Sequence, residues 1–234
     1  MTAPYISIII PVYNEAATIP EIIQRVRSAP LDLSIELIVV DDASTDGTAY
    51  ILEKLVSEGR EGLRLVSHKV NRGKGAAVQT GIAHARGEII LIQDADLEYD
   101  PRDYPKLLEP ILEGEADVVF GNRFHGGPHR VLYFWHYVGN WVLTLLTNVL
   151  TGLNLSDMEV GYKVFRADVL KRLTFKSGRF GIEPEIAIKV ARLGCRVYEV
   201  PIRYHGRTYE EGKKITWRDG VAALFHIVRY RFFD

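Results

Sequence analysis

The chain of 234 residues has one cysteine, Cys195, and almost no net charge. A single thiol excludes an internal disulfide and a metal site built from several cysteines, and it favours a reducing, cytoplasmic setting. The 29 basic and 30 acidic side chains give a formal charge of −1. Overall charge therefore gives no reason to expect nucleic acid as a partner.

The sequence also lacks a linker, an internal repeat and a low-complexity segment. We expect no signal peptide, because residues 1–4 run into a strand-like segment without the basic and apolar regions of a secretory leader. With 47% hydrophobic and 25% charged residues, the composition is typical of a soluble globular protein. This length supports one large core, so we expect a single domain over residues 1–234.

The first two thirds of the chain alternate strand and helix patterns. Short runs rich in Val and Ile, separated by helical patterns, predict crossover units and an α/β fold with a mainly parallel, twisted sheet flanked by helices. The expected strands are Tyr5–Val12, Ile35–Val40, Leu63–His68, Glu88–Gln93 and Asp117–Phe120, and the expected helices are Glu15–Arg27, Thr48–Glu58, Gly75–Ala85 and Tyr104–Glu113.

The last third has fewer strands and longer helices. A long helix is predicted at about Val131–Thr151 and a final helix at Trp217–Phe232. Between them the patterns predict strands at Tyr162–Arg166 and Arg196–Val200 and a helix at Ile182–Leu193.

Polar clusters follow all five strands of the first part. In open parallel sheets, ligands bind beyond the carboxyl ends of the strands, so these clusters should share one edge. The clusters are residues 11–15 (PVYNE), 41–48 (DDASTDGT), 71–75 (NRGKG), 94–98 (DADLE) and 121–124 (GNRF).

The cluster that begins at Asp94 is the chemical centre. Asp94 and Asp96, one residue apart after an apolar strand, offer the carboxylate oxygens that Mg²⁺ or Mn²⁺ prefers, and Glu98 adds a third carboxylate. Such a metal neutralises a diphosphate leaving group as its bond breaks. The alternative is a turn or helix cap built by Asp side chains, and the four other clusters favour the metal.

Two further clusters suit a nucleotide. Asp41 and Asp42 can accept hydrogen bonds from a base, although Asp42 can equally cap the following helix. The Gly-rich basic loop at 71–75, with Lys74, opens a helix and suits an anion, but it is not a P-loop. An ordinary basic turn is nearly as good an interpretation.

Together these motifs resemble the family 2 glycosyltransferases. More narrowly they are similar to the dolichyl-phosphate mannose synthase-like group, the polyprenyl-phosphate hexosyltransferases. The similarity reaches about Trp217 and also rests on residues 156–157 (SD), 161–166 (GYKVFR) and 200–203 (VPIR).

The resemblance implies a GT-A fold and an inverting hexosyltransferase that moves mannose or glucose from a GDP- or UDP-hexose to a polyprenyl phosphate. Residues 1–125 would form the nucleotide-sugar-binding half and residues 126–234 the acceptor-side half. Asp94 would contact the donor and act in catalysis with Asp96, and Asp96 with Glu98 would hold Mg²⁺ or Mn²⁺. The predicted donor-binding residues are Pro11, Tyr13, Glu15, Asp41, Asp42, Lys74, Asp94 and Ala95.

The acceptor decides whether a general base is needed. A lipid phosphate is already anionic near neutral pH and needs only cations to place it; we expect Arg123, helped by Arg207, Lys213 and Lys214. A soluble or glycan hydroxyl requires a base, for which Glu183 is the candidate. The alternative interpretation of Glu183 is stabilisation of a helix N-terminus. A non-catalytic nucleotide-sugar-binding protein is a third alternative, which the Asp94, Asp96 and Arg123 set disfavours.

The long uncharged helix raises the question of a membrane. One of its sides carries His136, Asn140, Thr144, Thr147 and Thr151, which is costly in lipid, so we expect no span. We expect an amphipathic helix that lies in a bilayer interface or closes an acceptor groove, with core packing as the alternative. The final helix is also amphipathic, and the resulting expectation is a cytoplasmic protein, peripheral at the inner face of a membrane.

Overall fold

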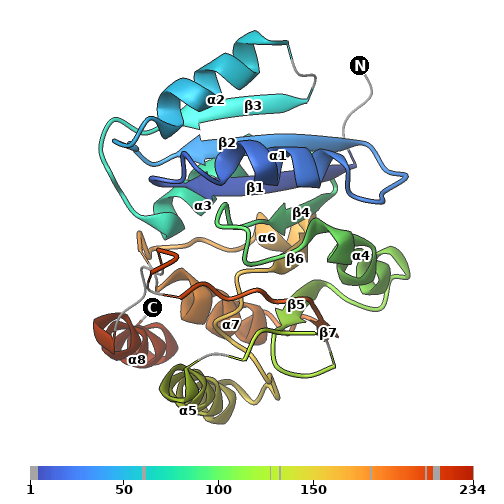
Figure 1. The fold of residues 1–234 in the computed structure, drawn as a ribbon. Coiled ribbons are helices and arrows are strands. Elements are labelled where there is room, and N and C mark those ends of the chain that lie inside the picture. The colour runs from blue at the N-terminus through green and yellow to red at the C-terminus, as the bar shows by residue number, and fades with distance from the viewer. Residues whose placement is uncertain are drawn as a thin grey trace.

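In a computed structural model, the structure describes residues 5–59, 62–126, 128–131, 133–179, 181–208, 210–212 and 217–233. Figure 1 shows the sheet running through the molecule with helices packed on both of its faces. The helices are α1 (Ile19–Arg27), α2 (Thr48–Ser57), α3 (Lys74–His84), the 3₁₀ turn η1 (Pro101–Asp103), α4 (Tyr104–Leu112), α5 (Phe134–Thr151), α6 (Ala167–Leu170), α7 (Ile182–Arg192) and α8 (Trp217–Phe232).

The strands form one seven-stranded sheet in the order β3-β2-β1-β4-β6-β5-β7. Neighbouring strands are parallel except where β6 pairs with β4 and β5, and both of those pairings are antiparallel. The predicted α/β fold with a mainly parallel sheet, flanked by helices and ending in C-terminal helices, is confirmed. The strands are β1 (Ile6–Val12), β2 (Ile35–Asp41), β3 (Leu63–Ser67), β4 (Ile89–Ile92), β5 (Val118–Asn122), β6 (Lys163–Arg166) and β7 (Val197–Pro201).

The core explains why the strand sequences are unbroken apolar runs. All seven residues of β1 are buried, because helices cover both faces of the sheet at this strand. One cluster of buried side chains extends from Ile6 to Tyr230, so the two halves of the chain share a core. The division near residue 125 therefore stays an interpretation of roles and marks no separate folding unit.

The antiparallel strand β6 places an extra segment at the edge of the sheet where the polar clusters lie. β1, β2, β4 and β5 all end at this edge, whereas β6 begins there. Residues 157–162, which precede β6, therefore lie beside the residues that follow β4 and β5. The sequence patterns predict the strand but not its direction, so this neighbourhood appears only in the structure.

The helix α5 turns its polar side inward. Thr144 and Thr147 are buried, and the Thr144 hydroxyl accepts a hydrogen bond from the Met158 amide at 3.1 Å. Trp135 and Val149 on the other side are 77% and 72% exposed. The amphipathic pattern is present, but the apolar side faces away from the protein, which is opposite to a core-packing helix.

The two amphipathic helices lie together. α5 packs against α8, and Figure 1 shows the pair at one end of the molecule, away from β3 and α2. Exposed apolar side chains on α8 include Val221, Phe225 and Phe232. Within the described residues, the structure has no helix of sufficient length and apolar character to cross a bilayer.

Two helical glycines test the close packing of α3 on the sheet. A Cβ at Gly81 in α3 would lie 2.3 Å from Ile9 Cγ2 in β1, whereas a Cβ at Gly139 in α5 would meet no atom within 4 Å. Alanine favours a helix at both positions by up to about 1 kcal/mol, and only Gly81→Ala adds a clash in the core, which costs about 1–3 kcal/mol. We expect Gly81→Ala to lower the free energy of unfolding in urea titrations and Gly139→Ala to leave it unchanged or raise it. Equal values for the two variants would contradict this packing.

Candidate functional site

A large cavity runs along the edge where the strands end. Its volume is about 1690 Å³, above the 300–1,000 Å³ of a typical small-ligand pocket, so it has room for two substrates. α5 and α8 contribute to its wall. The predicted site residues that line it are Pro11, Tyr13, Glu15, Asp42, Lys74, Asp94, Ala95, Asp96, Glu98, Arg123, Glu183 and Arg207.

Three non-glycine residues adopt left-handed backbone conformations at this edge. Asn14, Ala43 and Leu97 have φ values of 54°, 60° and 63° and follow β1, β2 and β4. Such conformations are uncommon outside glycine and gather at functional sites. The Asn14 side-chain oxygen accepts a hydrogen bond from the Thr45 amide at 2.8 Å, which ties the first two strand ends together.

Asp42 holds the Gly-rich loop that begins at Asn71. Its carboxylate accepts hydrogen bonds from the amides of Arg72 at 2.9 Å and Gly73 at 2.6 Å, and His68 Nδ1 lies 2.6 Å from it. These two amides are therefore engaged by Asp42 and not directed at an anion. The loop owes its shape to this carboxylate, which itself lines the cavity.

Asp41, predicted as a donor-binding residue, lies at the end of β2. It is buried, and its Oδ1 accepts hydrogen bonds from the Ser44 amide at 3.2 Å and the Ser44 hydroxyl at 2.5 Å. It is not among the residues that line the cavity. Its carboxylate builds the turn after β2, as short acidic side chains do in turns, and its predicted donor contact stays a prediction.

Lys74 joins Asp94 to Glu183. Its ammonium lies 2.8 Å from Asp94 Oδ1 and 2.9 Å from Glu183 Oε1. Burial alone would lower the pKa of Lys74, but the two carboxylates raise it well above its usual value. Lys74 therefore stays charged and orients both acids at the cavity wall, and its predicted donor contact stays a prediction.

Asp96 and Glu98 meet Arg207 from the loop that follows β7. Arg207 Nη2 lies 3.2 Å from Asp96 Oδ2, and its guanidinium is 3.6 Å from Glu98 and 3.5 Å from Glu15. Arg207, predicted as an acceptor-phosphate residue, thus lies on the predicted metal ligands. One guanidinium here faces three carboxylates, so the group keeps an excess of negative charge.

This excess of negative charge suits a divalent cation. Burial, Asp94 and Glu98 raise the pKa of Asp96 to about 7, because another negative charge is unfavourable there. Across the described ranges, no three His, Cys, Asp or Glu side chains form a ready-made metal cage. Mg²⁺ and Mn²⁺ commonly take one or two carboxylates and complete their shell with substrate phosphates, so Asp96 with Glu98 fits such an ion.

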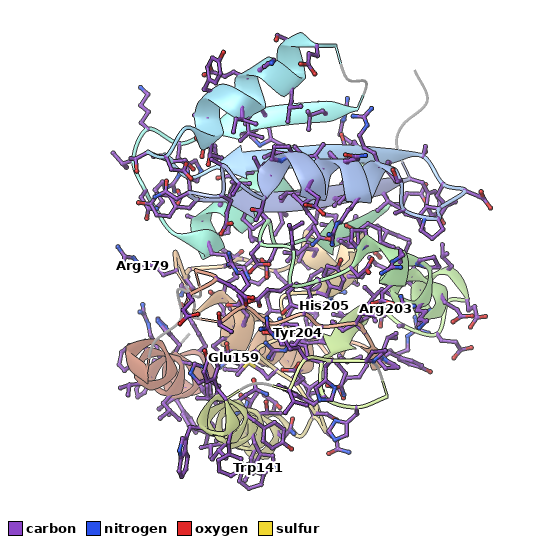
Figure 2. The ribbon with its side chains drawn as sticks, in the orientation of Figure 1. Trp141, Glu159, Arg179, Arg203, Tyr204 and His205 are labelled. Carbon is purple, nitrogen blue, oxygen red and sulfur yellow. The ribbon has the colours of Figure 1, made fainter. Side chains whose placement is uncertain are left out.

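The loop after β7 is fastened to Glu98. The Glu98 carboxylate accepts hydrogen bonds from the Arg207 amide at 2.9 Å and the Tyr204 hydroxyl at 3.0 Å, and the His205 amide donates to the Glu98 carbonyl at 2.9 Å. Tyr204 and His205 are labelled near the centre of the view in Figure 2. The loop that carries Arg207 is therefore held over the acidic cluster.

Arg123 is fixed from three sides. Its guanidinium donates to both carboxylate oxygens of Asp157 at 2.6 Å and to Asn140 of α5 at 3.3 Å. It also packs over the rings of Phe124 and Tyr204, with ring centroids at 5.2 and 5.3 Å. The carboxylate of Asp157 keeps the pKa of Arg123 well above its usual value despite burial, so a permanent cation faces the cavity.

The remaining predicted residues differ in where the structure places them. Glu183 lines the cavity and its Oε2 is buried without a hydrogen-bond partner among the described residues. Its neighbour Glu185 is fully buried, accepts from the amides of Lys176 and Ser177 at 2.7 and 2.8 Å, and is structural. Lys213 and Lys214 lie outside the described residues.

The structure adds residues that the sequence patterns did not single out. Asp157, Asn140 and Tyr204 surround Arg123, and Glu159 lines the cavity between Asp94 and Arg123. Asp157 falls within a motif that carries the family resemblance, which was the available signal. Glu159 had none, because its role depends on the direction of β6.

The comparisons with known proteins identify the family of this chain. A model described as glycosyl transferase family 2 matches residues 7–174. The dodecaprenyl-phosphate galacturonate synthase of Rhizobium johnstonii is 30% identical over 230 residues, which cover 95% of this chain and 64% of that protein. The undecaprenyl-phosphate mannosyltransferase of Micrococcus luteus is 32% identical over 212 residues, which cover 88% of this chain and 85% of that protein.

Solved structures show the same fold. Glucosyl-3-phosphoglycerate synthase from Mycobacterium tuberculosis, in complex with Mn²⁺ and UDP-glucose, matches with a TM-score of 0.74 at 24% identity. The match covers 97% of this chain and 79% of that one, and it supports the GT-A-like architecture. Since the family model spans most of the sequence and a relative at 32% identity is matched over most of its length, this chain belongs to glycosyltransferase family 2.

Proposed function

We propose that this protein transfers a hexose from a nucleotide-diphosphate sugar to a polyprenyl phosphate, with inversion at the anomeric carbon. The observation that carries the proposal is one continuous cavity with the Asp94 and Asp96 acids at one strand end and the buried cation Arg123 two strands away. This order suits a donor diphosphate at the acids and an anionic acceptor at the cation.

The donor half of the proposal rests on the first strand ends. Pro11, Tyr13 and Asp42 line the cavity beside the acids, and the Tyr13 ring, 40% exposed, is proposed to pack against the base. The solved relative that binds UDP-glucose and Mn²⁺ supports a uridine nucleotide and a divalent ion. GDP-hexose is the other candidate, and mannose or glucose is the proposed sugar.

The metal is assigned to Asp96 and Glu98. A bound Mg²⁺ or Mn²⁺ supplies positive charge that stabilises the diphosphate as it leaves. Asp94 is held by Lys74 at 2.8 Å, so its role in the proposal is to contact the donor sugar-nucleotide from a fixed position. Arg207, which lies 3.2 Å from Asp96 Oδ2, adds a cation beside the proposed metal and phosphate positions.

The acceptor half rests on Arg123 and on the relatives. The relatives from Rhizobium johnstonii and Micrococcus luteus are both named for polyprenyl-phosphate acceptors. A phosphate monoester is largely dianionic near neutral pH, so its oxygen attacks without a general base and needs only to be placed. Arg123, oriented by Asp157, is the cation proposed to place it, with Lys213 and Lys214 as further candidates.

A hydroxyl acceptor is the second candidate function. It is favoured by Glu183 Oε2, which is buried in the cavity region without a partner among the described residues and is therefore available as a base. The glucosyl-3-phosphoglycerate synthase that shares the fold is named for a soluble acceptor. The lipid phosphate remains the leading proposal, because α5 and α8 present an apolar surface beside the cavity.

We further propose that this apolar surface docks on a membrane at the cytoplasmic face. Phe134, Trp135 and Trp141 of α5 are 66%, 77% and 53% exposed, and Phe225 of α8 is 63% exposed. Aromatic side chains suit the interfacial layer of a bilayer. A polyprenyl phosphate carries its phosphate at that layer, so docking would bring the acceptor to the mouth of the cavity.

Activity assays test the acceptor and the metal together. UDP-glucose and GDP-mannose are supplied with Mn²⁺ or Mg²⁺, with and without a short polyprenyl phosphate, and glycolipid is measured. We expect product that requires both the lipid phosphate and the metal.

Asp96→Ala should lower turnover by at least about 100-fold, because one ligand of the charge-stabilising ion is lost. Asp32→Ala, an exposed acid remote from the cavity, is the matched control. Turnover that persists in a chelator would refute the metal, and product formed only on hydroxyl acceptors would favour the second candidate.

Vesicle sedimentation tests the docking surface. Replacement of Trp135 and Trp141 by Ser should reduce binding to vesicles of anionic and zwitterionic phospholipids by about tenfold or more, since each aromatic ring contributes apolar burial. The control pair is Tyr50→Ser with Val70→Ser, which are 72% and 65% exposed on the opposite half of the chain. Equal sedimentation of both double variants, or a wild-type protein that dimerises through this surface and ignores vesicles, would overturn the proposal.

A further inference from the structure

The position of Glu159 follows from the order of the strands. β6 lies between β4 and β5, and it begins at the edge where those two strands end. Asp94 follows β4, Arg123 follows β5, and Glu159 precedes β6. Along this edge Glu159 therefore lies between the acid assigned to the donor and the cation assigned to the acceptor. The transferred sugar has to occupy that interval.

The turn that carries Glu159 is fastened at both ends. The Gly161 amide donates to the Tyr99 hydroxyl at 2.8 Å, and a Cβ at Gly161 would lie 2.1 Å from Asp94 Oδ2, so the backbone packs directly on that acid. At the other end, Asp157 holds Arg123 at 2.6 Å. Glu159 is consequently held at a fixed place in the cavity wall (Figure 2).

Glu159 and Glu183 each keep one unused oxygen. Glu159 Oε1 and Glu183 Oε2 are buried and have no hydrogen-bond partner within the described part of the chain, and both residues line the cavity. A buried acceptor without a donor is unfavourable, and a bound ligand that supplies hydroxyl donors removes that cost. A hexose carries several such hydroxyl groups.

The charge around Glu159 is unfavourable for a carboxylate on a bound sugar. Burial and the negative charge of Glu183 raise the pKa of Glu159 to about 8, while Lys163 and Arg123 oppose the rise. The surroundings of Glu159 thus resist one further negative charge. A carboxylate on the sugar would meet the same resistance, whereas a neutral hexose would not.

We propose that Glu159 is a specificity-determining residue that hydrogen-bonds the hydroxyl groups of the transferred sugar and restricts the donor to neutral hexoses, excluding uronic acids. This inference rests on the proposed function, because it assumes that a nucleotide sugar fills the cavity. It concerns sugar selection and leaves the nucleotide and metal contacts unaffected.

Binding measurements separate the sugar contribution from that of the nucleotide. Isothermal titration calorimetry with Mn²⁺ gives Kd for UDP, UDP-glucose and UDP-glucuronate; GDP, GDP-mannose and GDP-mannuronate replace them if only GDP binds. The wild-type protein should bind the hexose nucleotide about tenfold or more tightly than the uronate nucleotide, since like charges placed together are strongly disfavoured.

Substitutions then test whether Glu159 supplies the contribution of the sugar to binding. In Glu159→Leu the ratio of Kd for UDP to Kd for UDP-glucose should fall about tenfold, because the hydrogen bonds are lost, while Kd for UDP stays within about twofold. Glu159→Gln, which keeps hydrogen-bonding capacity, should restore the ratio. The control is Glu53→Leu, an exposed acid on α2. If the Leu variant fails to fold, Glu159→Ala carries the same comparison.

The outcomes distinguish this inference from the proposed function. A wild-type protein that binds glucuronate and glucose nucleotides equally, or a Leu variant with an unchanged ratio, would overturn the role of Glu159 and leave the transferase proposal intact. A protein that binds neither UDP nor GDP would overturn the proposed function and this inference with it.

Discussion

The buried ammonium of Lys74 is the interaction on which the site depends. It lies within 2.9 Å of both Asp94, which follows β4, and Glu183, which belongs to α7, and so joins the two halves of the chain inside the cavity. Removal of one partner would leave a buried charge uncompensated, a situation that costs about 3–5 kcal/mol in comparable pairs. The same logic applies to Arg123 and Asp157. These buried ion pairs thus fix Asp94 and Arg123 in place at the cavity, and they make the geometry of the cavity part of the stability of the fold.

Negative charge is distributed unevenly around these pairs. Asp157 faces Arg123, and Asp94 shares Lys74 with Glu183, whereas Glu15, Asp96 and Glu98 share Arg207, and a further negative charge is resisted around Glu159. The unbalanced places are those that the proposed function assigns to a divalent ion and to the sugar. The ion-paired acids hold neighbouring segments of the chain together. This separation explains why the pKa values of Asp96 and Glu159 are raised, to about 7 and about 8, while the paired cations Lys74 and Arg123 remain charged.

The sequence predicts those parts of the fold and of the site that depend on local interactions. The Ile and Val runs identify the strands, and parallel strands share their carboxyl ends, so the meeting of Asp42, Asp94 and Arg123 at one edge was predictable. The direction of β6 was not, because an apolar run has the same pattern in either direction, and Glu159 was therefore missed. Asp41 and Asp42 are identical in type and adjacent, yet Asp41 ends β2 and Asp42 follows the strand, and only Asp42 lines the cavity. Arg207 lies on Asp96 through a contact between residues 111 positions apart, which no local pattern encodes.

The inverted polarity of α5 connects the surface to the chemistry. Its inward polar side is needed for contacts that the site uses: Asn140 accepts a hydrogen bond from Arg123 at 3.3 Å, and Thr144 holds the turn that contains Met158 and Glu159. Because a helix has two sides, the use of the polar side for the site leaves the apolar side exposed to the surroundings. In the proposed function this exposed side meets lipid, so any displacement of α5 on docking would be transmitted to Arg123 through Asn140.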